Sequence, residues 1–242
     1  MHQLVTSTYR PSGVVATYFG TEPTGITLSM ASRATLMRYT KLGSVPKYVA
    51  TTPDGRYVLV TNWCTYDLSV IDTATNTEVK RLKMGGAYPR GIAVDPSSKT
   101  AYVAVMGGRD IVTVDLTTFA LGRIADVGHG PRHLVMSPDG ATLYVTLNGD
   151  GNVAAIDLAT KRVTARVSTG SQPRSMAISA DGRSLYVVNY ASSTVSKLDA
   201  ATMQVLQKVP TRHHPIGITY DALTGRVWVA GYSGTLELFD ET

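Results

Sequence analysis

The chain has 242 residues, of which 43% are hydrophobic and 17% are charged, and its formal net charge is +5. These proportions are ordinary for a globular protein and exclude a disordered chain. The basic residues are spread along the sequence rather than clustered among aromatic residues, so nucleic acid is not an expected partner.

Neither a membrane span nor a targeting segment is predicted. No apolar stretch reaches about 18 residues, the length at which a transmembrane helix is suspected. Residues 1–8 contain neither a basic region nor an apolar core, so no signal peptide is expected. We interpret the chain as cytoplasmic, although an exported protein trimmed of its leader has the same appearance. The single cysteine, Cys64, excludes a disulfide within the chain and leaves the compartment open.

A unit of 42 or 43 residues recurs along the sequence. It opens on the prolines Pro46, Pro89, Pro131, Pro173 and Pro215, and aspartates keep nearly the same step at Asp72, Asp115, Asp157, Asp199 and Asp240. A repeat of this length indicates one supersecondary unit, copied so that neighbours bury each other's apolar faces. A divergent first copy precedes these, because Pro11-Ser12-Gly13 aligns with Pro53-Asp54-Gly55.

Four strands are predicted in each copy. In the copy that opens at Pro46 they cover residues 47–51, 57–61, 68–72 and 78–83, and Pro53-Asp54-Gly55 forms the first turn. Later copies repeat this order through 131–136, 143–146 and 153–157, and through 173–178, 185–189 and 194–199. Short β-branched runs without helical periodicity predict the four-stranded antiparallel blades of an all-β propeller, not a helical solenoid.

The pattern Pro-x-x-x-Ala/Val, Pro-Asp-Gly, Leu-Tyr-Val-Thr-x-Asn and Val-x-x-Ile-Asp-x-Ala-Thr resembles the YVTN-type β-propeller repeat, strongly over residues 43–242. The resemblance implies a single propeller domain over residues 1–242. The family includes surface-layer and periplasmic propellers, and its relatives carry haem d1 or act as lactonases. Because propellers host unrelated functions, the resemblance leaves the activity open.

The register of the repeat counts six copies, and the last ends after its third strand, at residues 240–242. A six-bladed ring with one incomplete blade is therefore predicted. Two alternatives stay open. Residues 2–9 can cross over and supply the missing outer strand, or the chain is a truncated seven-bladed ring.

The residue after the opening proline is basic in four consecutive copies. These residues are Lys47, Arg90, Arg132 and Arg174, and Ile216 follows in the last copy. The first strand of a propeller blade lines the central channel, so the resemblance implies that these cations converge. Arginine binds carboxylate or phosphate through two parallel N–H donors, which predicts an anion site. Salt bridges between neighbouring blades are the alternative.

Aromatic residues are expected on the same rim. They are Trp63, Tyr66, Tyr190 and Tyr232 in the loops after second strands, and Tyr88 beside an opening proline. Aromatic residues and arginine are enriched in binding hot spots. We therefore predict a binding scaffold that recognises a small anionic or aromatic molecule, or a protein partner.

Histidines interrupt the repeat at His129, His133, His213 and His214. Neutral imidazole is a common general base and metal ligand, so histidines that meet from separate blades favour an enzyme. The alternative function is thus a lyase, lactonase-like hydrolase or cyclase, with a divalent metal as its conceivable cofactor. No carboxylate or thiolate with the spacing of a zinc site accompanies them, and solvated rim histidines are the competing interpretation.

The recurring aspartates are predicted to serve the fold. Each ends a strand and opens a turn, where a carboxylate accepts nearby backbone N–H groups. Residues 148–152 are likewise predicted to form a tight turn rather than a calcium loop. Motifs of serine hydrolases, zinc proteases, phosphate-binding loops and c-type haem attachment are absent from the sequence.

Overall fold

The computed structural model describes residues 7–8, 14–17, 25–30 and 38–240. Residues 11–13, which align the first copy, lie outside this part, and so do most of residues 2–9, considered as a closing strand. Of the latter, Ser7–Thr8 (β1) pairs with Val14–Thr17 (β2). The described residues contain no helix of the length and apolarity needed to cross a membrane.

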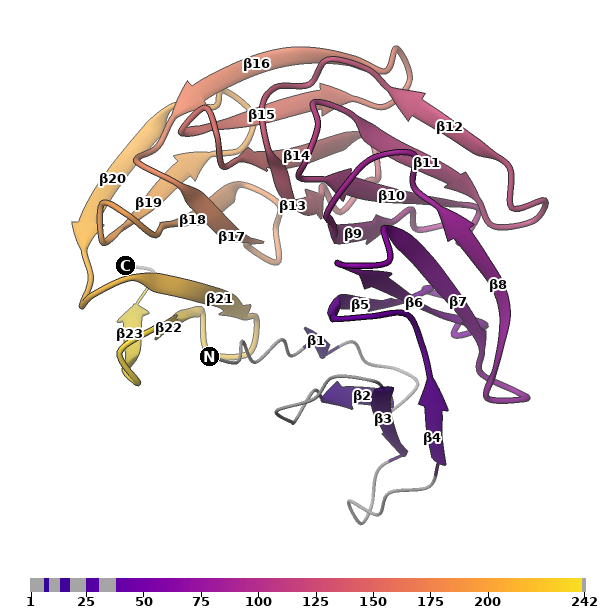
Figure 1. Cartoon of the computed structure of the whole chain (residues 1–242). Coiled ribbons are helices and arrows are strands. Elements are labelled where there is room, and N and C mark those ends of the chain that lie inside the picture. Colours follow the sequence, from indigo (N-terminus) through magenta and orange to yellow (C-terminus); the bar gives the residue numbers. More distant parts are fainter. Residues whose placement is uncertain (1–6, 9–13, 18–24, 31–37, 241–242) are drawn as a thin grey trace. The chain divides into compact units, whose positions relative to one another are not determined.

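Antiparallel sheets of strands that are consecutive in the chain make up the described structure (Figure 1). The first sheet contains β1, β2, β3 (Gly25–Met30) and β4 (Arg38–Lys41). The second sheet contains β5 (Pro46–Thr51), β6 (Tyr57–Asn62), β7 (Asp67–Asp72) and β8 (Thr77–Lys83). The third sheet contains β9 (Pro89–Val94), β10 (Thr100–Val105), β11 (Ile111–Asp115) and β12 (Leu121–Ile124). The fourth sheet contains β13 (Pro131–Met136), β14 (Thr142–Leu147), β15 (Asn152–Asp157) and β16 (Arg162–Ser168). The fifth sheet contains β17 (Pro173–Ile178), β18 (Ser184–Asn189), β19 (Thr194–Asp199) and β20 (Val205–Pro210). The last described sheet contains β21 (Pro215–Asp221), β22 (Arg226–Gly231) and β23 (Leu236–Asp240).

These sheets confirm the predicted all-β class with four-stranded antiparallel sheets, and the strands expected from the repeat begin and end within one residue of the observed bounds. The sheet of β21, β22 and β23 has three strands among the described residues. The count of six blades and the organisation as a single domain stay predictions.

The chain divides into two compact units. The first unit comprises Met1–Gly107 and Val112–Arg123, and the second comprises Gly108–Ile111 and Ile124–Thr242. In the first unit β5 contacts β9, and in the second β17 contacts both β13 and β21. First strands of successive sheets are therefore neighbours within each unit, and β5, β9, β13 and β17 carry the predicted cations.

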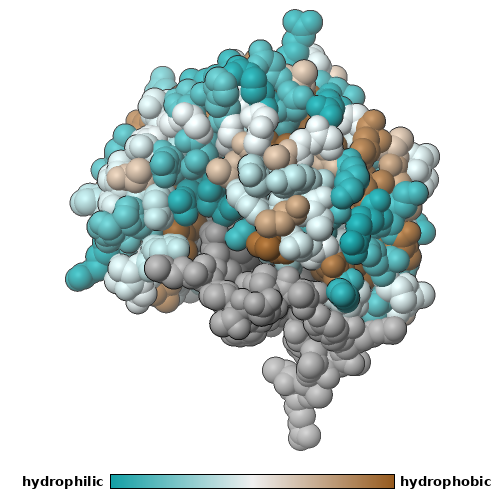
Figure 2. Space-filling model, in the orientation of Figure 1, coloured by the Kyte–Doolittle hydropathy of each residue, from teal (hydrophilic) through white to brown (hydrophobic). Residues whose placement is uncertain are grey.

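Each unit has an apolar core between its sheets. Leu59, Leu68 and Val103 are fully buried in the first, and Leu185 and Leu198 in the second. Strands β6 and β18 are buried along their whole length, because their sheets are covered on both faces and apolar residues fill both sides. Full burial of one such side chain contributes about 1.5–3 kcal/mol. The outer strand β16 alternates instead, and Figure 2 shows a surface that is mainly teal and white with scattered brown patches.

Threonines of the second strands fix the first strand of the following sheet. Thr61 donates its hydroxyl to the carbonyl of Arg90 at 2.7 Å, and Thr146 donates to the carbonyl of Arg174 at 2.9 Å. Each such bond contributes about 1 kcal/mol net. The threonine of the repeat thereby sets the backbone position of the next basic residue.

Left-handed backbone recurs directly before the opening prolines. The φ angles are 55° at Val45, 62° at Tyr88, 64° at Gly130, 53° at Gln172 and 55° at His214. The carbonyls of these residues accept N–H groups from the next loop, as in Trp63 to Val45 at 2.9 Å and Tyr190 to Gln172 at 3.1 Å. Only glycine adopts such φ angles freely, and left-handed backbone costs other residues about 1–2 kcal/mol.

Four of the five recurring aspartates stabilise turns, as predicted, whereas Asp240 accepts the Nε–H group of Arg226 at 2.8 Å. Asp72, Asp157 and Asp199 each accept the N–H of the residue three positions later, at 2.9, 2.6 and 2.7 Å. Asp115 accepts N–H groups from Thr117 and Thr118. These backbone bonds hold the pKa of each carboxyl below its ordinary value. The predicted turn at 148–152 is also confirmed, because Gly151 N–H bonds the carbonyl of Leu147.

Candidate functional site

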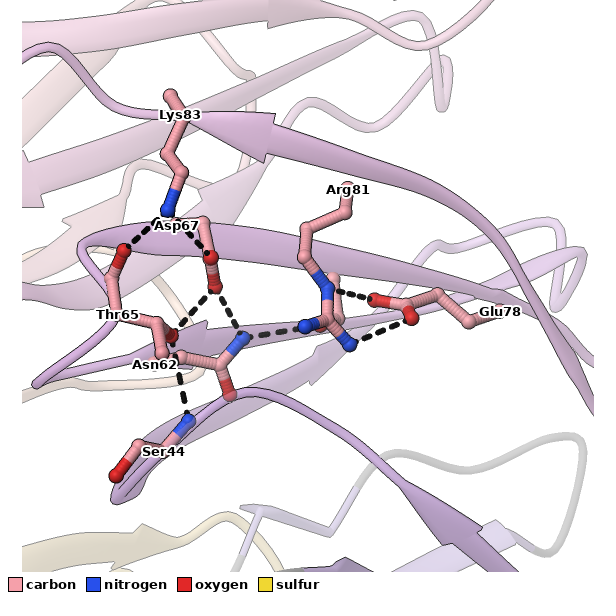
Figure 3. A network of polar contacts seen from close by, with 8 residues as sticks. Ser44, Asn62, Thr65, Asp67, Glu78, Arg81 and Lys83 are labelled. Atoms are coloured by element: carbon pink, nitrogen blue, oxygen red, sulfur yellow. Dashed lines mark hydrogen bonds and ion pairs between the residues drawn. The ribbon is translucent and has the colours of Figure 1, made fainter.

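A polar network around the buried Asp67 side chain fixes the loop after β6 (Figure 3). The Asn62 amide donates to Asp67 Oδ1 at 2.8 Å, and the Thr65 hydroxyl donates to the same oxygen at 2.9 Å. Lys83 Nζ reaches Asp67 Oδ2 at 3.2 Å and the Thr65 carbonyl at 2.8 Å. Asp67 is 1% exposed, so this network holds the loop that carries Trp63 and Tyr66.

The same kind of anchor recurs in other copies. A side-chain oxygen of the loop accepts the N–H of the residue two positions before the opening proline: Thr65 from Ser44, Asp150 from His129, and Ser192 from Ser171. These three acceptors occupy one position of the repeat. The loops that carry the predicted site residues are therefore attached to the start of the first strand.

In the first unit, five of the predicted site residues meet. We call Lys47, Trp63, Tyr66, Tyr88 and Arg90 the first-unit cluster. The ring centroids of Trp63 and Tyr88 are 4.6 Å apart, and the Tyr66 ring meets that of Tyr88 edge-on at 5.4 Å. Lys47 Nζ lies 5.7 Å and Arg90 Cζ lies 5.3 Å from the Trp63 ring centroid, within cation–π distance.

In the second unit, another five meet. We call Arg174, Tyr190, His213, His214 and Tyr232 the second-unit cluster. Arg174 Cζ lies 3.3 Å from the Tyr190 ring centroid, and His214 stacks on Tyr190 at 4.3 Å with an interplanar angle of 16°. The His213 ring meets His214 edge-on at 3.7 Å, and the Tyr232 ring meets Tyr190 edge-on at 6.2 Å.

Two groups of this cluster are electrostatically perturbed. Burial lowers the pKa of the half-buried Arg174, which remains charged at neutral pH. Its Nε is buried and has no hydrogen-bond acceptor within the described part of the chain. Desolvation, followed by the charges of His213 and Arg174, lowers the pKa of His214. His214 is therefore mainly neutral at pH 7 and can accept a proton.

The other two predicted histidines have different partners. His129 Nδ1 lies 3.0 Å from Asp150 Oδ1, and its Nε2 lies 2.5 Å from Arg109 Nη1. The same Arg109 Nη1 also lies 3.0 Å from His129 Nδ1. Arg109 Nε also donates to Asp126 at 2.6 Å. His133 Nδ1 accepts the backbone N–H of Met176 at 3.3 Å.

The four histidines thus lie in three places: His129 beside Arg109 and Asp150, His133 beside Met176, and His213 beside His214. Among the contacts described above, His213 and His214 form the only histidine pair. Arg132, predicted to form an anion site together with Lys47, Arg90 and Arg174, is only 5% exposed. Sequence reasoning missed Arg109 and Asp150 as partners of His129. The signal for Asp150 was available, because it occupies the repeat position of Thr65 and Ser192.

Within the described residues, no group of three or more histidine, cysteine, aspartate or glutamate side chains is placed to hold a metal ion. A metal therefore has no assigned ligands in either cluster. The chemistry that both clusters offer is aromatic stacking combined with positive charge.

Consecutive antiparallel meanders built from one repeat define the class of β-propeller proteins. The chain belongs to the family described as "Lactonase, 7-bladed beta-propeller", whose model matches residues 28–164. The model described as "Cytochrome D1 heme domain" matches residues 117–229. The predicted number of six blades differs from the seven in the family's description.

A solved structure of hydrazine synthase from Kuenenia stuttgartiensis is similar to this chain. The TM-score is 0.65 at 20% sequence identity, over 95% of this chain and 93% of that chain. At this identity the similarity shows the fold alone. No curated protein matches the chain.

Proposed function

We propose that the chain is a ligand-binding β-propeller whose second-unit cluster binds a small molecule through a carboxylate or similar planar oxyanion. The observation that carries the proposal is the buried Nε of Arg174, which has no acceptor within the described part of the chain. A buried donor without a partner costs about 1–3 kcal/mol. Binding an oxygen acceptor removes this cost.

The orientation of Arg174 suits such a ligand. Because Arg174 Cζ lies 3.3 Å from the centroid of the Tyr190 ring, one face of the guanidinium is covered, and a ligand is left with the edge that carries the in-plane N–H donors. A carboxylate binds that edge with two parallel hydrogen bonds. Tyr232, with 40% of its surface exposed, lies beside Tyr190 and offers a further hydroxyl. Tyr232 is thus an exposed residue of the cluster beside which a ligand would reach Arg174.

Calorimetric titration with acetate, benzoate and gluconate tests the proposal. Arg174→Gln removes one charge-assisted interaction worth about 1.5–3 kcal/mol, so affinity should fall about 10- to 150-fold. Arg174→Lys should retain part of it, since lysine keeps the charge without the fork. The matched control is Arg183→Gln, because Arg183 lies in the same unit with 86% of its side chain exposed. Equal, small losses in Arg174→Gln and Arg183→Gln reject the proposal.

A second candidate function is lactone hydrolysis at the same cluster. The family description and the lowered pKa of His214 favour it. His214 would accept a proton from the water that attacks the lactone carbonyl carbon, and Arg174 would stabilise the developing oxyanion. The ring C–O bond then breaks, and the proton passes from His214 to the leaving alkoxide. The product is a hydroxy acid, whose carboxylate matches the proposed anion site.

Proton release during hydrolysis of γ- and δ-lactones at constant pH measures this activity. His214→Gln should abolish turnover, whereas His129→Gln should leave it unchanged because His129 has other partners. If the wild-type protein hydrolyses no lactone faster than buffer does, lactone hydrolysis is rejected and ligand binding is the remaining proposed function.

A further inference from the structure

The first-unit cluster contains two tyrosines at backbone positions that favour glycine. The φ angles are 56° at Tyr66 and 62° at Tyr88. At the repeat position of Tyr66, three other copies have Gly151, Ser193 and Gly234, all with positive φ, whereas Arg109 in the copy that opens at Pro89 does not have a positive φ. At the position of Tyr88 they have Val45, Gly130, Gln172 and His214. The turns form with any of these residues, so the fold alone does not require tyrosine at either position.

Packing does not account for the two rings either. Tyr66 is 40% exposed and Tyr88 is 39% exposed, although both contact other aromatic rings. Together with Trp63 they form one continuous, partly exposed aromatic surface, held by the polar network around Asp67. Exposed aromatic side chains that the turns do not require, gathered in one place, are typical of a binding site.

The charge beside this surface selects the ligand. Lys47 and Arg90 both lie over the Trp63 ring and bring two positive charges to the cluster. A hydrogen bond with Tyr88 raises the pKa of Tyr66, so the Tyr66 hydroxyl is neutral at pH 7. A planar ring with a negative group complements both features, because it can stack on one tyrosine and meet the other edge-on while its charge faces the cations.

We propose that the first-unit cluster is a binding site for a planar aromatic anion, of which an aromatic carboxylate is the simplest case. The ring of the ligand lies against Tyr66 and Tyr88, and its carboxylate lies toward Lys47 and Arg90. This site is additional to the one proposed in the second unit and does not depend on it.

Three probes separate the contributions of ring and charge. 2-Naphthoate carries both, 2-naphthylmethanol has the ring without the charge, and cyclohexanecarboxylate has the charge without an aromatic ring. Binding is measured in the Arg174→Gln variant, in which the second-unit anion site is removed, by calorimetry and by protection of Cys64, the exposed thiol next to Trp63, from iodoacetamide. We expect 2-naphthoate to bind at least about tenfold more tightly than either other probe and to slow alkylation of Cys64. Equal affinity for cyclohexanecarboxylate and 2-naphthoate overturns the proposal.

Glycine variants test the tyrosines without disturbing the turns. Tyr66→Gly and Tyr88→Gly remove the rings but suit the left-handed backbone, so both should unfold at a higher temperature than the corresponding alanine variants. Each should weaken 2-naphthoate binding at least about fivefold and abolish protection of Cys64. Gln172→Gly is the matched control, since it changes the equivalent position in the second unit, and it should leave both readouts unchanged.

The two sites are distinguished by Arg174→Gln. This variant should leave protection of Cys64 by 2-naphthoate intact, even if acetate binding is lost. Protection that persists in Tyr66→Gly and Tyr88→Gly contradicts the proposal, as does protection that disappears in Arg174→Gln.

Discussion

Replacing Gly130 by alanine tests the conclusion that the backbone must be left-handed before each opening proline. Gly130 has a φ of 64°, and a Cβ added there would lie 3.1 Å from the backbone nitrogen of Gly149. The left-handed conformation costs alanine about 1–2 kcal/mol. The smaller entropy of the unfolded alanine chain offsets about 0.4–1 kcal/mol of this. The tight backbone contact adds to the loss, so we expect a net destabilisation of about 1 kcal/mol.

Thermal and urea unfolding followed by circular dichroism measure this change. For a protein of this size, 1 kcal/mol corresponds to a fall in Tm of about 2–4 °C. Gln172→Gly is the reciprocal variant at the equivalent position, where φ is 53°. It relieves strain but increases the entropy of the unfolded chain, so its Tm should stay equal or rise slightly. The reasoning is refuted if Gly130→Ala unfolds like the wild type, or if Gln172→Gly is destabilised as much as Gly130→Ala.

Three further predictions concern pH and packing. Stability should fall as pH drops below 3.8, the ordinary carboxyl pKa, because Asp157 and its equivalents keep a lower pKa in the folded state. When Tm is measured over a series of acidic pH values, Asp157→Asn should lose less Tm than the wild type. The affinity of the protein for acetate should rise as pH falls through the pKa of His214, which lies below 6.5, because the imidazole gains positive charge. Calorimetry should show that the acetate affinity of His214→Gln depends less on pH than that of the wild type. Gly170→Ala should lower the Tm, since the new Cβ would lie 2.7 Å from Asn189 Cγ; an unchanged Tm contradicts this contact.

Much of the fold follows from the sequence. Strand positions and turns were predictable because each copy carries its own local signals. Residues such as Asp157 recur at one register, and Pro-Asp-Gly supplies the turn chemistry between the first two strands. The assignment of the recurring aspartates to turns rested on the same repetition, and backbone hydrogen bonds confirm it for Asp72, Asp115, Asp157 and Asp199.

The composition of each cluster could be predicted only in part. The sequence placed Arg174 and Tyr190 on one rim, but the stacking of His214 on Tyr190 joins two successive sheets and depends on their lateral packing. The contact of His129 with Arg109 likewise joins two loops about 20 residues apart, which strand periodicity does not address. Burial of Arg132 was also outside the reach of the repeat, because its equivalents Lys47, Arg90 and Arg174 are only partly buried.

The most direct measurement of the proposed anion site is the NMR signal of the Arg174 Nε–H group. Its ¹⁵N–¹H resonance is assigned from its absence in Arg174→Lys and followed by NMR during titration with benzoate, with benzamide as the uncharged control. The proposed anion site predicts a saturable shift of this resonance with benzoate and none with benzamide. An Arg174 resonance that moves no more than that of the exposed Arg183 contradicts the account.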